Sequence, residues 1–128
     1  MSEAFATRRL PAQPDVVATD GSAVRVLARL PRGSAAHFTL APGATSRAVA
    51  HRTVEEIWYF VSGRGELWRK AGEQEDVVLV ERDVCVTIPV GTHFQFRALG
   101  DEPLAAVGVT MPPWPEAGDA DLVEGKWR

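Results

Sequence analysis

The residues best suited to chemistry lie in one stretch, residues 42–63. It contains one histidine, His51, and a carboxylate, Glu56, five positions later. Polar and apolar residues alternate from Glu56 onward, so Glu56, Trp58 and Phe60 are expected on one face of a strand. The same alternation places His51 on the inner side of the preceding strand. We therefore expect His51 and Glu56 to meet inside a sheet, beside aromatic rings.

The His51–Glu56 pair allows two interpretations. An ionised glutamate in an aromatic pocket is costly unless it is paired, and His51 is its nearest partner, so the pair can be purely structural. Alternatively, the pair lies at the open end of an apolar cavity. There the carboxylate raises the proton affinity of the imidazole, and His51 serves as general acid or base with Glu56 orienting it. The residues alone leave both interpretations open.

The spacing of Gly43, His51, Glu56 and Gly63 resembles the first sequence motif of the cupin superfamily. In this frame Val49 occupies the position of the first histidine. Residues 88–97, which read Ile-Pro-Val-Gly-Thr-His-Phe-Gln-Phe-Arg, resemble the second motif. Cupins include metal enzymes, isomerases, lyases and binding proteins, so the resemblance implies a fold more strongly than an activity.

A complete cupin metal centre has three histidines and one carboxylate, and this chain supplies two of the four ligands in frame. Phe94 occupies the ligand position of the second motif, with His93 one place early. Alternation turns His93 away from the interior if Phe94 faces it, whereas a bulge at residues 91–92 would reverse that orientation. A divalent transition metal held weakly by His51, Glu56 and His93 is therefore an alternative, and no cofactor is certain.

The distribution of strands and turns predicts an all-β fold. Short alternating segments are separated by Gly, Pro and Asp turns, with no helical period, which favours a single antiparallel β-barrel or jelly roll. The cupin resemblance implies the same fold. We expect an extended arm at 1–20, a cupin β-barrel at 21–112, and a tail at 113–128 that packs on the barrel or on a partner subunit. The prolines of this tail lack the donors needed to continue a sheet.

The amino-acid composition limits the classes of partner that we expect for this protein. The formal net charge of −3 and the scattered basic residues give no reason to expect nucleic acid binding. No apolar run reaches the roughly 18 residues of a membrane span. The single cysteine, Cys85, agrees with a reducing compartment, so we expect a cytoplasmic protein. Arms at both ends that can cover an exposed sheet edge favour a homodimer.

The residues at interior positions predict an apolar pocket with one polar group. Small barrels can be solid or can keep room for one small ligand. We therefore expect a small, largely apolar or aromatic metabolite, bound by a metal-independent isomerase or lyase that uses His51 and Glu56. The alternatives are a degenerate metal enzyme and a non-catalytic binding protein. The expected pocket residues are Val49, Trp58, Phe60, Phe94 and Phe96.

Overall fold

The structure is a computed structural model that describes residues 4–114 and 119–128. These residues form eleven strands and no helix, which confirms the all-β prediction. Accordingly, no described helix is long and apolar enough to cross a membrane. The strands are β1 (Val16–Val17), β2 (Ala23–Leu30), β3 (Gly33–Leu40), β4 (Val49–His51), β5 (Glu55–Ser62), β6 (Arg64–Ala71), β7 (Gln74–Glu81), β8 (Cys85–Ile88), β9 (His93–Leu99), β10 (Leu104–Met111) and β11 (Ala120–Leu122).

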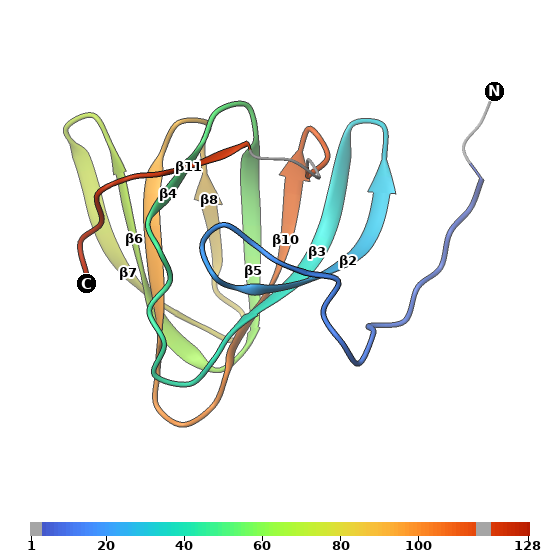
Figure 1. Ribbon diagram of the computed structural model, residues 1–128, viewed down its shortest axis with the longest axis horizontal. Helices are drawn as coiled ribbons and strands as arrows, with labels where there is room; N and C mark the ends of the chain where they lie inside the picture. Colours follow the sequence, from blue (N-terminus) through green and yellow to red (C-terminus); the bar gives the residue numbers. More distant parts are fainter. Residues whose placement is uncertain (1–3, 115–118) are drawn as a thin grey trace.

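The strands form two antiparallel sheets (Figure 1). The six-stranded sheet has the order β1-β2-β3-β10-β5-β8, and the five-stranded sheet has the order β11-β4-β9-β6-β7. Within the described residues the strand pairs do not join these sheets into one closed ladder. The structure thus shows two antiparallel sheets, and a single closed barrel stays a prediction.

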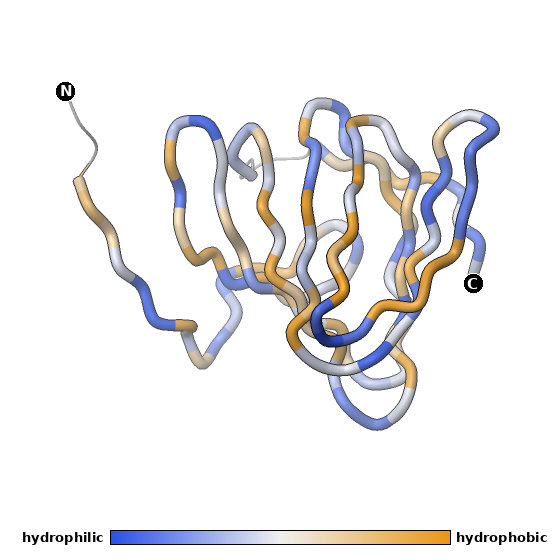
Figure 2. Tube along the Cα trace, turned by 180° about the vertical axis from the view of Figure 1, so that it is seen from behind, coloured by the Kyte–Doolittle hydropathy of each residue, from blue (hydrophilic) through white to orange (hydrophobic). Residues whose placement is uncertain are grey.

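Alternation along the strands fixes which side chains face inward. Along β5, buried Glu56, Trp58 and Phe60 alternate with exposed Glu55, Ile57 and Tyr59. Figure 2 shows hydrophobic and hydrophilic stretches following one another along the strands. At the end of β5 the chain crosses to the other sheet through Gly63, which has a φ of 76°. A Cβ there would lie 2.2 Å from the Pro103 carbonyl oxygen, so only glycine fits.

One hydrophobic core lies between the two sheets. The six-stranded sheet contributes Phe60 and Leu104, and the five-stranded sheet contributes Leu67 and Phe96. Each of these four side chains is at most 1% exposed. Because residues from both sheets share one cluster, the sheets form a single packing unit.

The two terminal segments extend the sheets at their edges. β1 pairs with β2, and β11 pairs with β4 through the partners Ala120 and His51. The expectation that the tail does not continue a sheet was wrong. Its two prolines, Pro113 and Pro115, precede residue 119, and the segment after them retains the N–H groups that a strand needs. Gln95 also anchors the tail, because its side chain accepts from the Trp127 N–H and donates to the Trp127 carbonyl, both at 2.9 Å.

Candidate functional site

The structure brings His51 and Glu56 together across the two sheets. His51 ends β4 in the five-stranded sheet, and Glu56 lies on β5 in the six-stranded sheet. Nε2 of His51 is 3.1 Å from Oε2 of Glu56, and the two side chains are 10% and 8% exposed. We expected the two residues to meet within one sheet. They meet between the sheets instead, because the short link at residues 52–54 carries the chain from one sheet to the other.

Sequence reasoning missed the second partner of His51. Nδ1 of His51 is 3.3 Å from Oδ2 of Asp119, so the imidazole lies between two carboxylates. Asp119 is itself held by the backbone N–H and hydroxyl of Thr53 and by the backbone N–H of Val54. Nothing in the sequence distinguished Asp119 from an ordinary turn residue beside a glycine.

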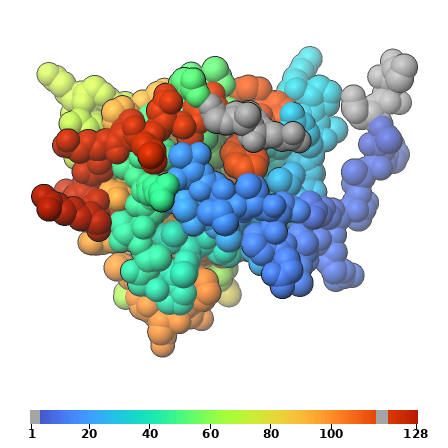
Figure 3. Space-filling model, in the orientation of Figure 1, coloured from blue at the N-terminus to red at the C-terminus, as the bar shows by residue number. Residues whose placement is uncertain are grey.

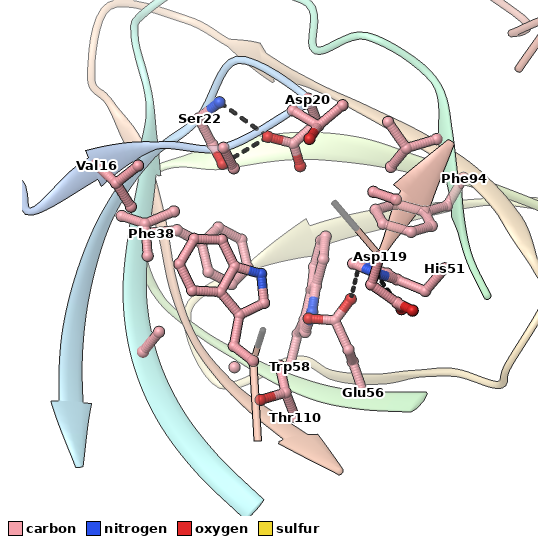
Figure 4. Close-up of a pocket in the computed structure, with 18 of the residues that line it drawn as sticks. Val16, Asp20, Ser22, Phe38, His51, Glu56, Trp58, Phe94, Thr110 and Asp119 are labelled. Atoms are coloured by element: carbon pink, nitrogen blue, oxygen red, sulfur yellow. Dashed lines mark hydrogen bonds and ion pairs between the residues drawn. The ribbon is translucent and has the colours of Figure 1, made fainter. Parts of the chain in front are cut away.

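A third carboxylate, Asp20, lies in the turn between β1 and β2. Its Oδ1 accepts hydrogen bonds from the Ser22 backbone N–H at 2.9 Å and the Ser22 hydroxyl at 2.7 Å. No hydrogen bond from the described residues reaches its Oδ2. Figure 4 shows Asp20 across the pocket from His51, Glu56 and Asp119. The sequence placed Asp20 in an extended arm, so it was not considered as a site residue.

The surroundings shift the proton affinities of these groups in different directions. Burial acts to lower the pKa of His51, but the Glu56 and Asp119 carboxylates outweigh burial and hold that pKa above 6.5. Burial likewise acts to raise the pKa of Asp119, and the hydrogen bonds from Thr53 and Val54 outweigh it and lower that pKa. Burial raises the pKa of the Asp20 carboxyl, because the Ser22 hydrogen bonds do not offset it. The two carboxylates thus favour the protonated form of His51, and the hydrogen bonds to Asp119 favour its ionised form.

These groups line a cavity of about 140 Å³. This is close to the roughly 150 Å³ of an apolar cavity that admits benzene. The terminal segments cover it, since residues 16–20 and Trp114 are part of its wall. Figure 3 shows the blue N-terminal and red C-terminal segments side by side on this face. Its principal lining residues are Asp20, Phe38, Val49, His51, Glu56, Trp58, Phe94, Gly108, Thr110, Trp114 and Asp119.

Three of the five predicted pocket residues line this cavity, and two do not. Val49, Trp58 and Phe94 are in its wall. Phe60 and Phe96 are absent from the wall and lie in the solid core, 0% and 1% exposed. The strand periodicity correctly predicted that both rings face inward. It does not predict whether an inward position faces other side chains or empty space.

Trp58 connects the cavity to the core. Its ring lies 4.5 Å from that of Phe38 and 5.4 Å from that of Phe94, measured between centroids. Trp58 is 2% exposed, and its indole Nε1 has no hydrogen-bond partner among the described residues. A Cβ on Gly108 would lie 3.1 Å from Cδ1 of Trp58. The glycine thus leaves room for this edge of the indole at the cavity wall.

His93 does not join the site. It begins β9 and pairs with Lys70 of β6 and Ala50 of β4. It lines a separate surface hollow with Trp68 and Lys70, away from the cavity that contains His51. Strand alternation continues through β9, so Phe94 faces inward and His93 does not. The expected grouping of His51, Glu56 and His93 is therefore wrong.

The residues present do not fit a cupin metal centre. Among the residues described, no group of three or more His, Cys, Asp or Glu side chains could hold a metal ion. Two ligand positions of the motif are filled by Val49 and Phe94, each 1% exposed. Both ring nitrogens of His51 already face carboxylates. A metal at His51 would have to break one of these ion pairs and would gain too few replacement ligands.

A family model for the cupin domain matches residues 36–110, more than half of the chain. The chain belongs to the cupin family. The matched range begins within β3 and ends within β10, so it contains His51 and Glu56 but neither Asp20 nor Asp119. The two carboxylates that the sequence analysis missed therefore come from the flanking segments. No curated protein matches the sequence.

Solved structures support the fold of this cupin. A Klebsiella pneumoniae protein with a double-stranded β-helix domain is 19% identical, with a TM-score of 0.66 over 98% of this chain and 100% of that one. Oxalate decarboxylase is 20% identical, with a TM-score of 0.73 over 91% of this chain and 31% of that one. The Schizosaccharomyces pombe Cnp3 cupin domain is 14% identical, with a TM-score of 0.64 over 71% of this chain and 64% of that one.

These likenesses establish the fold and not the activity. The chain spans less than two thirds of the oxalate decarboxylase and Cnp3 chains. The matched proteins also differ in what their names describe, since one name is that of an enzyme and another is that of a cupin domain. A function for this chain must therefore come from its own cavity.

Proposed function

We propose that this cupin binds a small, largely apolar ring compound in the cavity and catalyses metal-independent proton transfer with Glu56 and His51. One observation carries the proposal: the ion pair between these residues, 3.1 Å long, forms part of the wall of an aromatic cavity large enough for one ring. In this proposal the two sheets are the walls of a jelly-roll barrel whose covered end receives the ligand.

The two residues have different roles in this proposal. Both ring nitrogens of His51 face carboxylates, so His51 has no nitrogen left for the ligand. Oε2 of Glu56 is near His51 but lacks hydrogen-bond geometry. Its other oxygen points away from His51 (Figure 4). Glu56 is therefore the group that exchanges a proton with the ligand, and His51 holds it in place and balances its charge.

The chemistry fits the migration of a double bond next to a carbonyl group. Glu56 removes a proton from the carbon beside the carbonyl, and the electrons of that C–H bond move toward the carbonyl oxygen. Glu56 then returns this proton to the γ carbon, the far end of the original double bond, while the new double bond forms between the α and β carbons, so no other reactant is consumed. The indole N–H of Trp58 has no partner among the described residues, and in this proposal it donates to the carbonyl oxygen of the ligand.

The test uses the β,γ-unsaturated isomer of cyclohexenone as substrate probe and the absorbance of the conjugated product as readout. We expect the protein to accelerate the conversion. Glu56→Gln should slow it by at least about 100-fold, the usual contribution of a general acid or base. The matched control is Glu55→Gln, because Glu55 is the adjacent carboxylate on the exposed face of β5. This control should retain full activity.

Binding of the same probe, measured by calorimetry, separates the two parts of the proposal. Binding without acceleration would overturn catalysis and leave a ligand-binding protein. If neither this ketone nor benzyl alcohol binds, the entire proposal fails. Equal losses in Glu55→Gln and Glu56→Gln would show that the cavity carboxylate has no special role.

A further inference from the structure

The charges around the cavity are unbalanced. Asp20, Glu56 and Asp119 contribute three carboxylates to its wall, and His51 contributes the single cationic side chain. No Lys or Arg belongs to the described lining, and residues 1–3 and 115–118 contain neither type. His51 is paired with Glu56 and Asp119, so Asp20 has no ion-pair partner among the described residues.

Asp20 is positioned to receive a ligand. Ser22 fixes its Oδ1 through two hydrogen bonds, whereas no described hydrogen bond reaches Oδ2. The carboxylate lies on the wall opposite His51 and Glu56 (Figure 4). Burial opposes ionisation of Asp20, so its charged form gains from a counter-ion. The nearest cationic side chain, His51 across the cavity, is already paired with Glu56 and Asp119.

The remainder of the wall suits the body of such a ligand. Phe38, Trp58, Phe94 and Trp114 present aromatic rings to the cavity, and ring faces attract cations as well as apolar groups. The Trp58 N–H, at a side chain 2% exposed, is also left without a partner. An unpaired buried donor is costly, which is an independent sign that the cavity is shaped for an occupant.

We propose that the ligand of this cavity is a small protonated amine with an apolar or aromatic body, whose ammonium group pairs with Asp20. An anionic ligand is disfavoured, because its carboxylate would face three carboxylates and no free cation. This assignment rests on the proposed function, since it names the charge class of the molecule held beside Glu56. It adds a positive charge to the small, largely apolar or aromatic metabolite that we expected from the sequence.

The test compares three compounds of one shape that differ in charge. Benzylamine is a cation near neutral pH, benzyl alcohol is neutral and benzoate is an anion. Titration calorimetry on the unmodified protein should give benzylamine the highest affinity, at least about tenfold above benzyl alcohol, which corresponds to about 1.4 kcal/mol. Benzoate should be the weakest of the three.

A substitution then assigns the preference to Asp20. Asp20→Asn keeps the shape of the side chain and removes its charge, so the ratio of benzylamine to benzyl alcohol affinity should fall about tenfold. Benzyl alcohol affinity should remain nearly constant, which a general loss of structure would not allow. Asp101→Asn, in the exposed turn before β10, is the matched control and should leave the ratio unchanged.

Several other outcomes would contradict the proposed binding of an ammonium group by Asp20. Benzoate binding as tightly as benzylamine overturns the cationic class, as does an unchanged ratio in Asp20→Asn. If benzyl alcohol binds and benzylamine binds no better, this inference fails while the proposed apolar site remains. If none of the three compounds binds, this inference fails, and the proposed function fails with it only if the ketone does not bind either. If Asp20→Asn does not fold, the order of the three affinities in the unmodified protein still decides.

Discussion

The space between the two sheets has two contrasting ends. At one end Phe60, Leu67 and Phe96 pack without a gap, each at most 1% exposed. At the other end His51 and Glu56 border a cavity of about 140 Å³. Both ends are built from inward positions of the same alternating strands. The difference shows that strand periodicity creates an interior, whereas side-chain size and the covering segments decide whether that interior is solid or hollow.

The two ends should differ most in the free energy of unfolding that is lost when one aromatic side chain is truncated to alanine. Phe60→Ala removes a ring from the solid end and should lower the free energy of unfolding by about 3–5 kcal/mol. Phe38→Ala should cost less, about 2–3 kcal/mol, because part of the Phe38 ring already faces the cavity. Denaturant unfolding of both variants measures this. Equal losses would mean that the cavity end is packed as firmly as the core.

The adjacent carboxylates of β5 give the next largest contrast. Glu56→Gln breaks a buried ion pair with His51 and should lower the free energy of unfolding by about 1–3 kcal/mol. Glu55→Gln alters an exposed residue and should stay within about 0.5 kcal/mol of the unmodified protein. The measurement is again denaturant unfolding. A neutral Glu56→Gln would mean that the pair contributes nothing to folding.

The pKa of His51 predicts how stability depends on pH. Because the folded pKa lies above the unfolded value of 6.5, the contribution of His51 is complete below about pH 6.5. It is lost as the pH rises through the folded pKa. The groups facing His51 are Glu56 from β5, Asp119 before β11 and Asp20 across the cavity.

The measurement is the difference in unfolding free energy between the unmodified protein and His51→Gln across this pH range. The difference should shrink as the pH rises, by at most about 1.4 kcal/mol per pH unit for one proton. The pKa of His37 is lowered by burial and by Arg25, so His37 acts in the opposite direction. Because both proteins contain His37, it largely cancels. A difference that grows with pH would contradict the raised pKa.

Filling the cavity end should have the smallest effect on stability and a selective effect on binding. In Gly108→Ala the new Cβ would lie 3.0 Å from Cε1 of Phe38 and 3.1 Å from Cδ1 of Trp58. The rings must move slightly toward the cavity, so we expect a loss of about 1 kcal/mol in stability. Benzyl alcohol affinity should fall by about tenfold. Unchanged affinity would place the ligand elsewhere.

The sequence determined the local structure of this protein. Alternation along residues 55–62 predicted that Glu56, Trp58 and Phe60 face inward. The same rule predicted that His93 and Phe94 lie on opposite faces of their strand. These results follow from the period of two that any strand imposes on its side chains. The motif spacing around His51 and Glu56 was likewise sufficient to indicate the cupin family, which the match over residues 36–110 establishes.

Only the tertiary structure decided what the interior contains. It placed β4 and β5 in different sheets, so His51 and Glu56 meet between the sheets. It also brought Asp20 and Asp119, 99 positions apart in the chain numbering, to the walls of one cavity. Neither carboxylate belongs to a motif, and a turn aspartate has no periodic neighbour to reveal its direction. Long-range packing sets that direction, and packing is not encoded in any short stretch of sequence.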